Sequence, residues 1–238
     1  LDEAIKLSGE NKIDLVKIDV EGAEFGIIEN LKKETAANID SFLIEYHDLY
    51  FTDGMEKVTK LIQQLENLGY VVEKSTIKNS KFIYAAKTRK NYWLNKKEQV
   101  RLYNLHDFSK DFTWDTMGAG LHDGNNHMYK EMHYTHNEYT NGCIYERMGC
   151  VIEKGDVVVD LGANVGVFAN AAYYKGASKI YSFEPTDAAY KCLIKNKPIN
   201  CETFKMGVGD REGFSKISLD STENTMCASF STEEAISC

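Results

Sequence analysis

Residues 155–185, GDVVVDLGANVGVFANAAYYKGASKIYSFEP, decide the fold of this chain. The β-branched run VVV favours a strand, because such side chains are stiff at χ1 and pack well on a pleated sheet. Two glycines spaced four apart, Gly162 and Gly166, predict a tight turn after that strand. An apolar helical pattern and a second strand, ending at Glu184-Pro185, complete the stretch. This order and length predict a parallel βαβ unit.

The polar residues of this unit indicate a ligand that carries a ribose and a positive charge. Glu184 follows the turn by about 20 residues, where an acidic side chain can accept hydrogen bonds from ribose hydroxyls. The turn reads D-x-G-x-N-x-G and differs from the G-x-G-x-x-G pattern that holds a pyrophosphate. Asp160 beside the turn would repel a phosphate and attract a cation. These features favour S-adenosylmethionine, which has an amino group, a sulfonium and no phosphate. A purely structural βαβ unit and an NAD-dependent enzyme are the alternatives.

Composition describes a soluble, acidic protein. The chain has 238 residues, a formal net charge of −8 and 43% hydrophobic residues. An acidic surface does not attract nucleic acid or anionic lipid, so we expect neither partner. The apolar runs are too short for a membrane span, and no signal peptide is visible. The six cysteines form no C-x-x-C pair, which indicates reduced thiols and a cytoplasmic location.

A second acidic motif, KIDVEGAE, occupies residues 17–24. It places Asp19, Glu21 and Glu24 at the end of a predicted strand and the start of a helix. Ligands of open α/β sheets bind at the carboxyl ends of strands, so these acids are site candidates. Favourable interaction with the helix dipole is the alternative explanation for Glu21 and Glu24. His47 follows the next predicted strand, 41–46, at the same edge of the sheet.

KIDVEGAE, VVDLGANVG and YSFEP together resemble the FkbM family of S-adenosylmethionine-dependent methyltransferases. The resemblance implies an α/β fold, the Rossmann-like class I methyltransferase sheet, mostly parallel with an antiparallel edge hairpin. It also implies O-methylation, often of sugars or sugar-bearing metabolites. By this likeness the cofactor-binding residues are Asp160, Gly162, Asn164, Gly166, Glu184 and, near the adenine, Asp210.

The motifs occur in the reverse of the family order, because KIDVEGAE precedes the cofactor unit. We therefore divide the chain into three parts. Residues 1–90 correspond to the C-terminal half of a methyltransferase fold, and residues 151–238 correspond to its N-terminal, cofactor-binding half. Residues 91–150 form a connecting or cap segment between them. A piece of tandem domains and a circular permutant both explain this order. In either case we predict one sheet with the methyltransferase strand order 3-2-1-4-5-7-6. The strand at Ile13 would then lie beside the strand at Val157.

The expected reaction is methyl transfer to a hydroxyl group of a small molecule or glycan. Asp19, Glu21 and His47 are the candidate catalytic residues, since one of them could accept the hydroxyl proton. A structural role for His47 is an equal alternative. No metal is predicted; the weaker metal alternatives are Asp19 with Glu21 and His133 with His136. A non-catalytic module that binds S-adenosylmethionine or scaffolds a partner is the alternative function.

Overall fold

The computed structural model describes residues 1–75, 81–87, 150–211, 213, 217–218 and 229–230. The predicted cap segment, 91–150, and its histidines therefore fall almost wholly outside the described residues. Within the described part, no helix has the length and apolarity that crossing a membrane requires.

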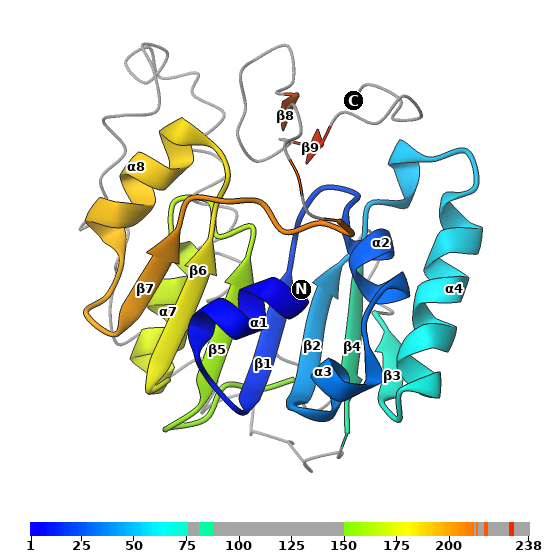
Figure 1. The fold of residues 1–238 in the computed structure, drawn as a ribbon, viewed down its shortest axis with the longest axis horizontal. Coiled ribbons are helices and arrows are strands. Elements are labelled where there is room, and N and C mark those ends of the chain that lie inside the picture. The colour runs from blue at the N-terminus through cyan, green and yellow to red at the C-terminus, as the bar shows by residue number, and fades with distance from the viewer. Residues whose placement is uncertain (76–80, 88–149, 212, 214–216, 219–228, 231–238) are drawn as a thin grey trace.

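A seven-stranded sheet forms the centre of the molecule, in the order β3-β4-β2-β1-β5-β6-β7 (Figure 1). Neighbouring strands are parallel except for β4, which runs antiparallel to both β2 and β3. Two further short strands, β8 and β9, form a separate antiparallel pair. The strands are β1 (Ile13–Ile18), β2 (Ile39–Glu45), β3 (Val71–Lys74), β4 (Phe82–Ala86), β5 (Val157–Leu161), β6 (Lys179–Phe183), β7 (Cys201–Phe204), β8 (Ile217–Ser218) and β9 (Ser229–Phe230).

The two halves of the chain join where β1 pairs with β5. The pairing is parallel, and Lys17 lies opposite Asp160 in its register. Renumbered in methyltransferase order, the observed sheet is the predicted 3-2-1-4-5-7-6, and its antiparallel edge is the predicted hairpin. The fold class predicted from the sequence is therefore confirmed.

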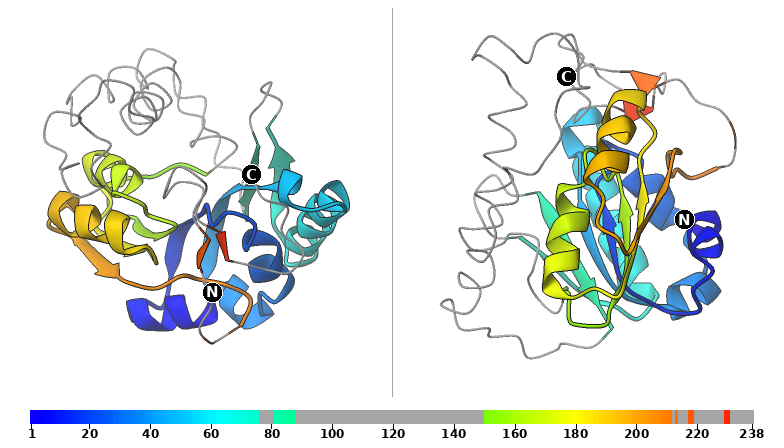
Figure 2. Two further views of the ribbon diagram at one scale, coloured as in Figure 1. Left: turned by 90° about the horizontal axis from the view of Figure 1, so that it is seen from above. Right: turned by 90° about the vertical axis from the view of Figure 1, so that its left-hand side faces the viewer.

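Helices cover both faces of the sheet (Figure 2). Buried residues of α1 to α4 pack in one cluster with Val16, Ile18 and Phe42. Buried residues of α7 pack in a second cluster with Leu15, Val158 and Ile180. The helices are α1 (Asp2–Ser8), α2 (Glu24–Glu29), α3 (Lys33–Ala37), the 3₁₀ turn η1 (Asp48–Tyr50), α4 (Gly54–Asn67), α7 (Val167–Lys175) and α8 (Asp187–Asn196).

Burial on both faces explains why the central strands are nearly continuous apolar runs. Val158 and Val159 are both fully buried, although they point to opposite faces. The amphipathic pattern of α4 behaves as predicted, since Val58, Leu61 and Leu65 enter the core.

The parallel strands present their carboxyl ends at one edge of the sheet, the upper edge in Figure 1. The turn after β5, the acidic motif after β1 and His47 after β2 all follow these ends. The chain after β7 crosses in front of this edge toward α2 (Figure 1). The topology thus gathers most of the predicted site residues in one region.

Candidate active site at the carboxyl edge of the sheet

The turn after β5 is fixed by its neighbours on both sides. The backbone N–H groups of Gly162 and Ala163 both donate to the carbonyl of Phe183, at 3.0 Å each. Gly162 has a φ of 77°, and a Cβ on it would lie 1.7 Å from the carbonyl oxygen of Asp19. A glycine is therefore required here by backbone conformation and by close packing of the turn against the end of β1.

Glu184 lies beside this turn, as the sequence predicts. Its Oε2 accepts a hydrogen bond from the backbone N–H of Asn164 at 2.9 Å. Its Oε1 accepts from the backbone N–H of Thr186 at 2.8 Å and from the Thr186 hydroxyl at 2.6 Å. Burial raises the pKa of Glu184, against the lowering effect of these bonds. Oε2 retains a lone pair, so Glu184 can still accept a bond from a ribose hydroxyl.

Asp160 and Asn164 carry buried oxygens that accept no hydrogen bond within the described part of the chain, although Lys17 forms an ion pair with Asp160. They are both oxygens of the fully buried Asp160 carboxyl group and the side-chain Oδ1 of Asn164. Buried polar atoms without partners are costly, and they commonly mark the place of an absent ligand or water. Asn164 also has a left-handed backbone, with a φ of 48°. The residues present therefore fit a ligand that supplies hydrogen-bond donors to this turn.

Lys17 modifies the electrostatic role that the sequence suggests for Asp160. Its ammonium lies 3.4 Å from Oδ1 of Asp160 and 3.3 Å from Oδ2 of Asp19, and donates to the carbonyl of Gly162 at 2.9 Å. Burial disfavours its charge, but the two carboxylates overcome this and raise the pKa of Lys17. Burial raises the pKa of Asp160, opposed by Lys17. The charge of Asp160 is thus partly balanced inside the protein.

Gly166 and Asp210 also make packing contacts with helices of the protein itself. Gly166 precedes α7 with a φ of 95°, and a Cβ on it would lie 2.9 Å from the side chain of Leu193 in α8. Its conformation and its packing against α8 account for the glycine. Asp210 packs against Gly26 of α2 and lies beside Arg211. The predicted contact of Asp210 with the adenine side stays a prediction.

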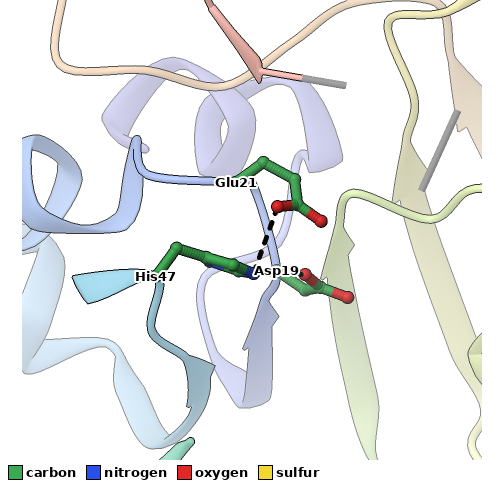
Figure 3. A group of neighbouring side chains, drawn as sticks. All are labelled: Asp19, Glu21 and His47. Carbon is green, nitrogen blue, oxygen red and sulfur yellow. Dashed lines mark ion pairs between the residues drawn. The ribbon is translucent and has the colours of Figure 1, made fainter. Parts of the chain in front are cut away.

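Asp19, Glu21 and His47 converge at the ends of β1 and β2 (Figure 3). Nε2 of His47 lies 3.3 Å from Oε2 of Glu21 and 3.9 Å from Oδ1 of Asp19. Glu21 reaches this position from a left-handed backbone with a φ of 51°. One polar atom from each residue falls within 4.8 Å of the other two, a separation at which they could share a metal ion.

The side chains of Glu24 and Tyr50 form hydrogen bonds that position this group. Glu24 is fully buried; its Oε1 accepts from the backbone N–H of His47 at 2.7 Å and contacts His47 Nδ1 at 3.3 Å. Its Oε2 accepts from the backbone N–H of Gly22 at 2.8 Å. The Tyr50 hydroxyl donates to Oε2 of Glu21 at 2.5 Å. Glu24 thus acts through specific bonds, which the helix-dipole explanation does not require.

The carboxylates of this group influence one another strongly. Burial, with repulsion from Asp19, raises the pKa of Glu21 to about 7, although His47 opposes the rise. Burial, with repulsion from Asp19, likewise raises the pKa of Glu45 to about 8. Burial disfavours the imidazolium of His47, but the hydrogen bond and charge of Glu24, together with Glu21, raise the pKa of His47 to about 10. Negative charge is therefore in excess at this edge of the sheet.

The turn after β5, which the sequence predicts to bind the cofactor (the cofactor turn), lies next to the group formed by Asp19, Glu21 and His47 (the acidic group). The backbone N–H of Asp19 donates to the carbonyl of Leu161 at 3.1 Å, and Lys17 contacts an acid on each side. Two segments far apart in the sequence thus form one continuous polar edge with two parts.

The strand order is the one expected for a Rossmann-like methyltransferase sheet. Residues 1–72 match the family model "Methyltransferase FkbM domain", which confirms the family resemblance for the part of the chain that holds Asp19, Glu21 and His47.

Solved structures and curated proteins add little to this match. A crystal structure of a putative DNA modification methylase from Thermus thermophilus, complexed with S-adenosyl-L-methionine, is similar at 15% identity with a TM-score of 0.38, over 85% of this chain and 97% of that chain. A likeness this weak supports no conclusion about the present protein. No curated protein matches the chain.

Sequence reasoning did not single out Lys17, Glu45 or Tyr50. Lys17 could have been found, because a lysine inside the apolar run IDLVKIDV must be paired if the strand is buried. Glu45 ends a similar run in β2. Tyr50 follows the strand in an irregular segment, where no periodicity indicates the direction of a side chain.

Proposed function

We propose that this protein is a methyltransferase that transfers the methyl group of S-adenosylmethionine to a hydroxyl group of a small molecule or glycan. The observation that carries the proposal is the set of buried side-chain oxygens on Asp160 and Asn164 that accept no hydrogen bond among the described residues, beside Glu184 at the carboxyl ends of two adjacent strands. The match of residues 1–72 to a methyltransferase family supports the same reaction class.

The turn would hold the donor through complementary polar groups. Glu184 would accept from the ribose hydroxyls, as an acid at this position of an α/β sheet commonly does. Asp160 and Asn164 would accept from the donor's amino group, because their buried oxygens accept no hydrogen bond among the described residues and Lys17 balances the Asp160 charge only in part. Gly162 and Gly166 would set the path of the backbone around it.

The acidic group after β1 would receive the acceptor. S-adenosylmethionine supplies an electrophilic methyl group: the acceptor oxygen forms a bond to that carbon while the carbon–sulfur bond breaks and its electron pair stays on sulfur. The protein must align oxygen, carbon and sulfur and accommodate the hydroxyl proton. Asp19 adjoins the turn after β5, and Glu21 and His47 are grouped with it at the same edge of the sheet, so all three would be placed to orient the hydroxyl.

Isothermal titration with S-adenosylmethionine tests the donor half of the proposal. We expect one site, and we expect Glu184→Gln to weaken binding at least tenfold, because a carboxylate accepts ribose bonds better than an amide does. Glu202→Gln, which removes the same charge from neighbouring β7, should bind as the unmodified protein does. Absence of binding to the unmodified protein would refute the proposal, and binding of NAD alone would favour the dehydrogenase alternative.

Transfer from donor labelled in its methyl group tests the acceptor half. We expect label to appear on the oxygen of a hydroxyl-bearing acceptor, with sugars and glycosylated small molecules as the first panel. Donor binding without transfer to any acceptor would instead identify a non-catalytic binding module.

A further inference from the structure

We propose that Asp19, Glu21 and His47 bind a single divalent cation, which in turn holds the acceptor hydroxyl. The role toward the acceptor rests on the proposed function, whereas cation binding itself does not. The ligand atoms would be Oδ1 of Asp19, a carboxylate oxygen of Glu21 and Nε2 of His47.

The spacing of these atoms suits one ion. When metal–ligand distances are about 2.1 Å, neighbouring ligands of an octahedral ion lie about 3 Å apart. Nε2 of His47 lies 3.3 Å from Glu21 Oε2 and 3.9 Å from Asp19 Oδ1. These separations need only small side-chain movements to close around an ion. The three residues come from the ends of two adjacent strands and so share a rigid support.

Each ligand is also held by a partner outside the group. Lys17 contacts Oδ2 of Asp19, which leaves Oδ1 facing His47. Tyr50 donates to Glu21, and the buried Glu24 contacts Nδ1 of His47. A carboxylate on Nδ1 holds a proton there, so a cation would displace the proton of Nε2 and bind its lone pair, as is common for histidines that bind metals. This arrangement orients all three ligand atoms inward.

The local charge favours a cation. Asp19, Glu21 and Glu24 lie around His47, and Glu45 is close enough to interact with Asp19. Lys17 is the ammonium that contacts this group among the described residues, and it is shared with Asp160. Two carboxylates with one imidazole suit Mn²⁺, Mg²⁺ or Zn²⁺ better than a soft metal.

A cation here would stand next to the transferred methyl group. Three protein ligands leave positions open for the acceptor oxygen, and coordination lowers the pKa of a bound hydroxyl. The hydroxyl proton would leave to solvent water, and the oxygen would then form its bond to the methyl carbon as the carbon–sulfur bond breaks. Asp19 adjoins the cofactor turn through its backbone bond to Leu161, which places the two reactants together.

Titration of the metal-free protein with Mn²⁺, followed by electron paramagnetic resonance, tests the proposal. We expect one bound ion and, in the pulsed spectrum, coupling to an imidazole nitrogen that His47→Ala removes. Asp19→Asn and His47→Ala should each weaken binding at least tenfold. Asp187→Asn, an exposed acid on α8, should have no effect. No binding at millimolar Mn²⁺, or binding without nitrogen coupling in the unmodified protein, would overturn the proposal even if the variants fail to fold.

Donor titration in the presence of a chelator separates this inference from the proposed function. We expect S-adenosylmethionine to bind equally with and without Mn²⁺, because its predicted contacts lie on the other side of Lys17. Mn²⁺ binding without donor binding would refute the methyltransferase proposal and leave the cation site standing. Donor binding and methyl transfer that persist in the chelator would refute the cation's role.

Discussion

At Gly162 a single missing side chain allows the two halves of the chain to meet. The residue has a φ of 77°, and its α-carbon approaches the carbonyl oxygen of Asp19 so closely that no side chain fits. Gly162 is thus required for two reasons: the turn after β5 needs its left-handed backbone, and the β1–β5 junction needs its close contact with Asp19.

Gly162→Ala should therefore destabilise the protein by about 2–5 kcal/mol, the sum of a left-handed backbone penalty and an overpacking penalty. Gly9→Ala is the matched control, because Gly9 has a φ of 68° but no heavy atom within 4 Å of the position that a Cβ would take. It should cost only about 1–2 kcal/mol. Urea unfolding of both variants measures the difference, and equal losses would show that the contact with Asp19 has no energetic importance.

Lys17 is the second residue on which the site depends. Lys17→Met should cost about 3–5 kcal/mol, because it leaves a buried carboxylate without its partner. The double variant Lys17→Met, Asp160→Asn should be more stable than Lys17→Met alone, since it removes the uncompensated charge as well. Chemical denaturation of Lys17→Met, Asp160→Asn and the double variant measures the three changes in the free energy of unfolding that a double-mutant cycle needs. Simple addition of the two single effects would contradict a direct interaction.

At the scale of elements, the β1–β5 pair is the junction that converts two sequence segments into one sheet. Each strand has a parallel neighbour from its own segment on the other side, β2 or β6. Without the junction, each segment would expose the edge of a buried parallel strand, which proteins rarely leave uncovered.

Ile18→Ala should thus weaken both segments, although it alters only one. Ile18 is fully buried opposite Leu161, and its truncation should cost about 2–5 kcal/mol. Val71→Ala in edge strand β3, where the side chain is 41% exposed, should cost about 0.5 kcal/mol. Hydrogen exchange reports the result: with Ile18→Ala, the amides of β6 and of β2 should lose protection together. Loss confined to β1 and β2 would show that the segments fold separately.

Elements were predictable from the sequence where local patterns and burial agree. The turn D-x-G-x-N-x-G defines the βαβ unit, and the reversed motif order already predicts which strands pair. The site was predictable only in part. Three of the predicted residues, Asp160, Glu184 and His47, lie at the ends of strands, and the topology predicts where those ends are. Asp210 instead follows the segment that crosses the edge of the sheet after β7, and the topology does not predict the path of that segment. The sequence could indicate that Lys17 is paired, but its pairing with Asp160 required the register of β1 against β5, and the role of Glu24 required the position of His47; both are tertiary facts.

At the scale of the whole molecule, the described parts of the two segments share one sheet and one polar edge. A ligand that binds only the folded state stabilises it by mass action, and free ligand at 100 times its dissociation constant adds about 2.7 kcal/mol. The predicted donor contacts lie in the second segment, but β1 and β5 join both segments in one sheet, so we expect S-adenosylmethionine to raise the stability of β2 as well as of β6. Hydrogen exchange with and without the donor measures this, and protection limited to β5 and β6 would contradict a cooperatively folded sheet.

The most direct test of the account is a crystal structure of the protein with S-adenosylmethionine. We predict that β1 and β5 lie side by side, that the ribose contacts Glu184, and that the methyl group faces Asp19 across the end of the sheet. A donor bound away from the turn at Gly162, or two separate half-sheets, would contradict it.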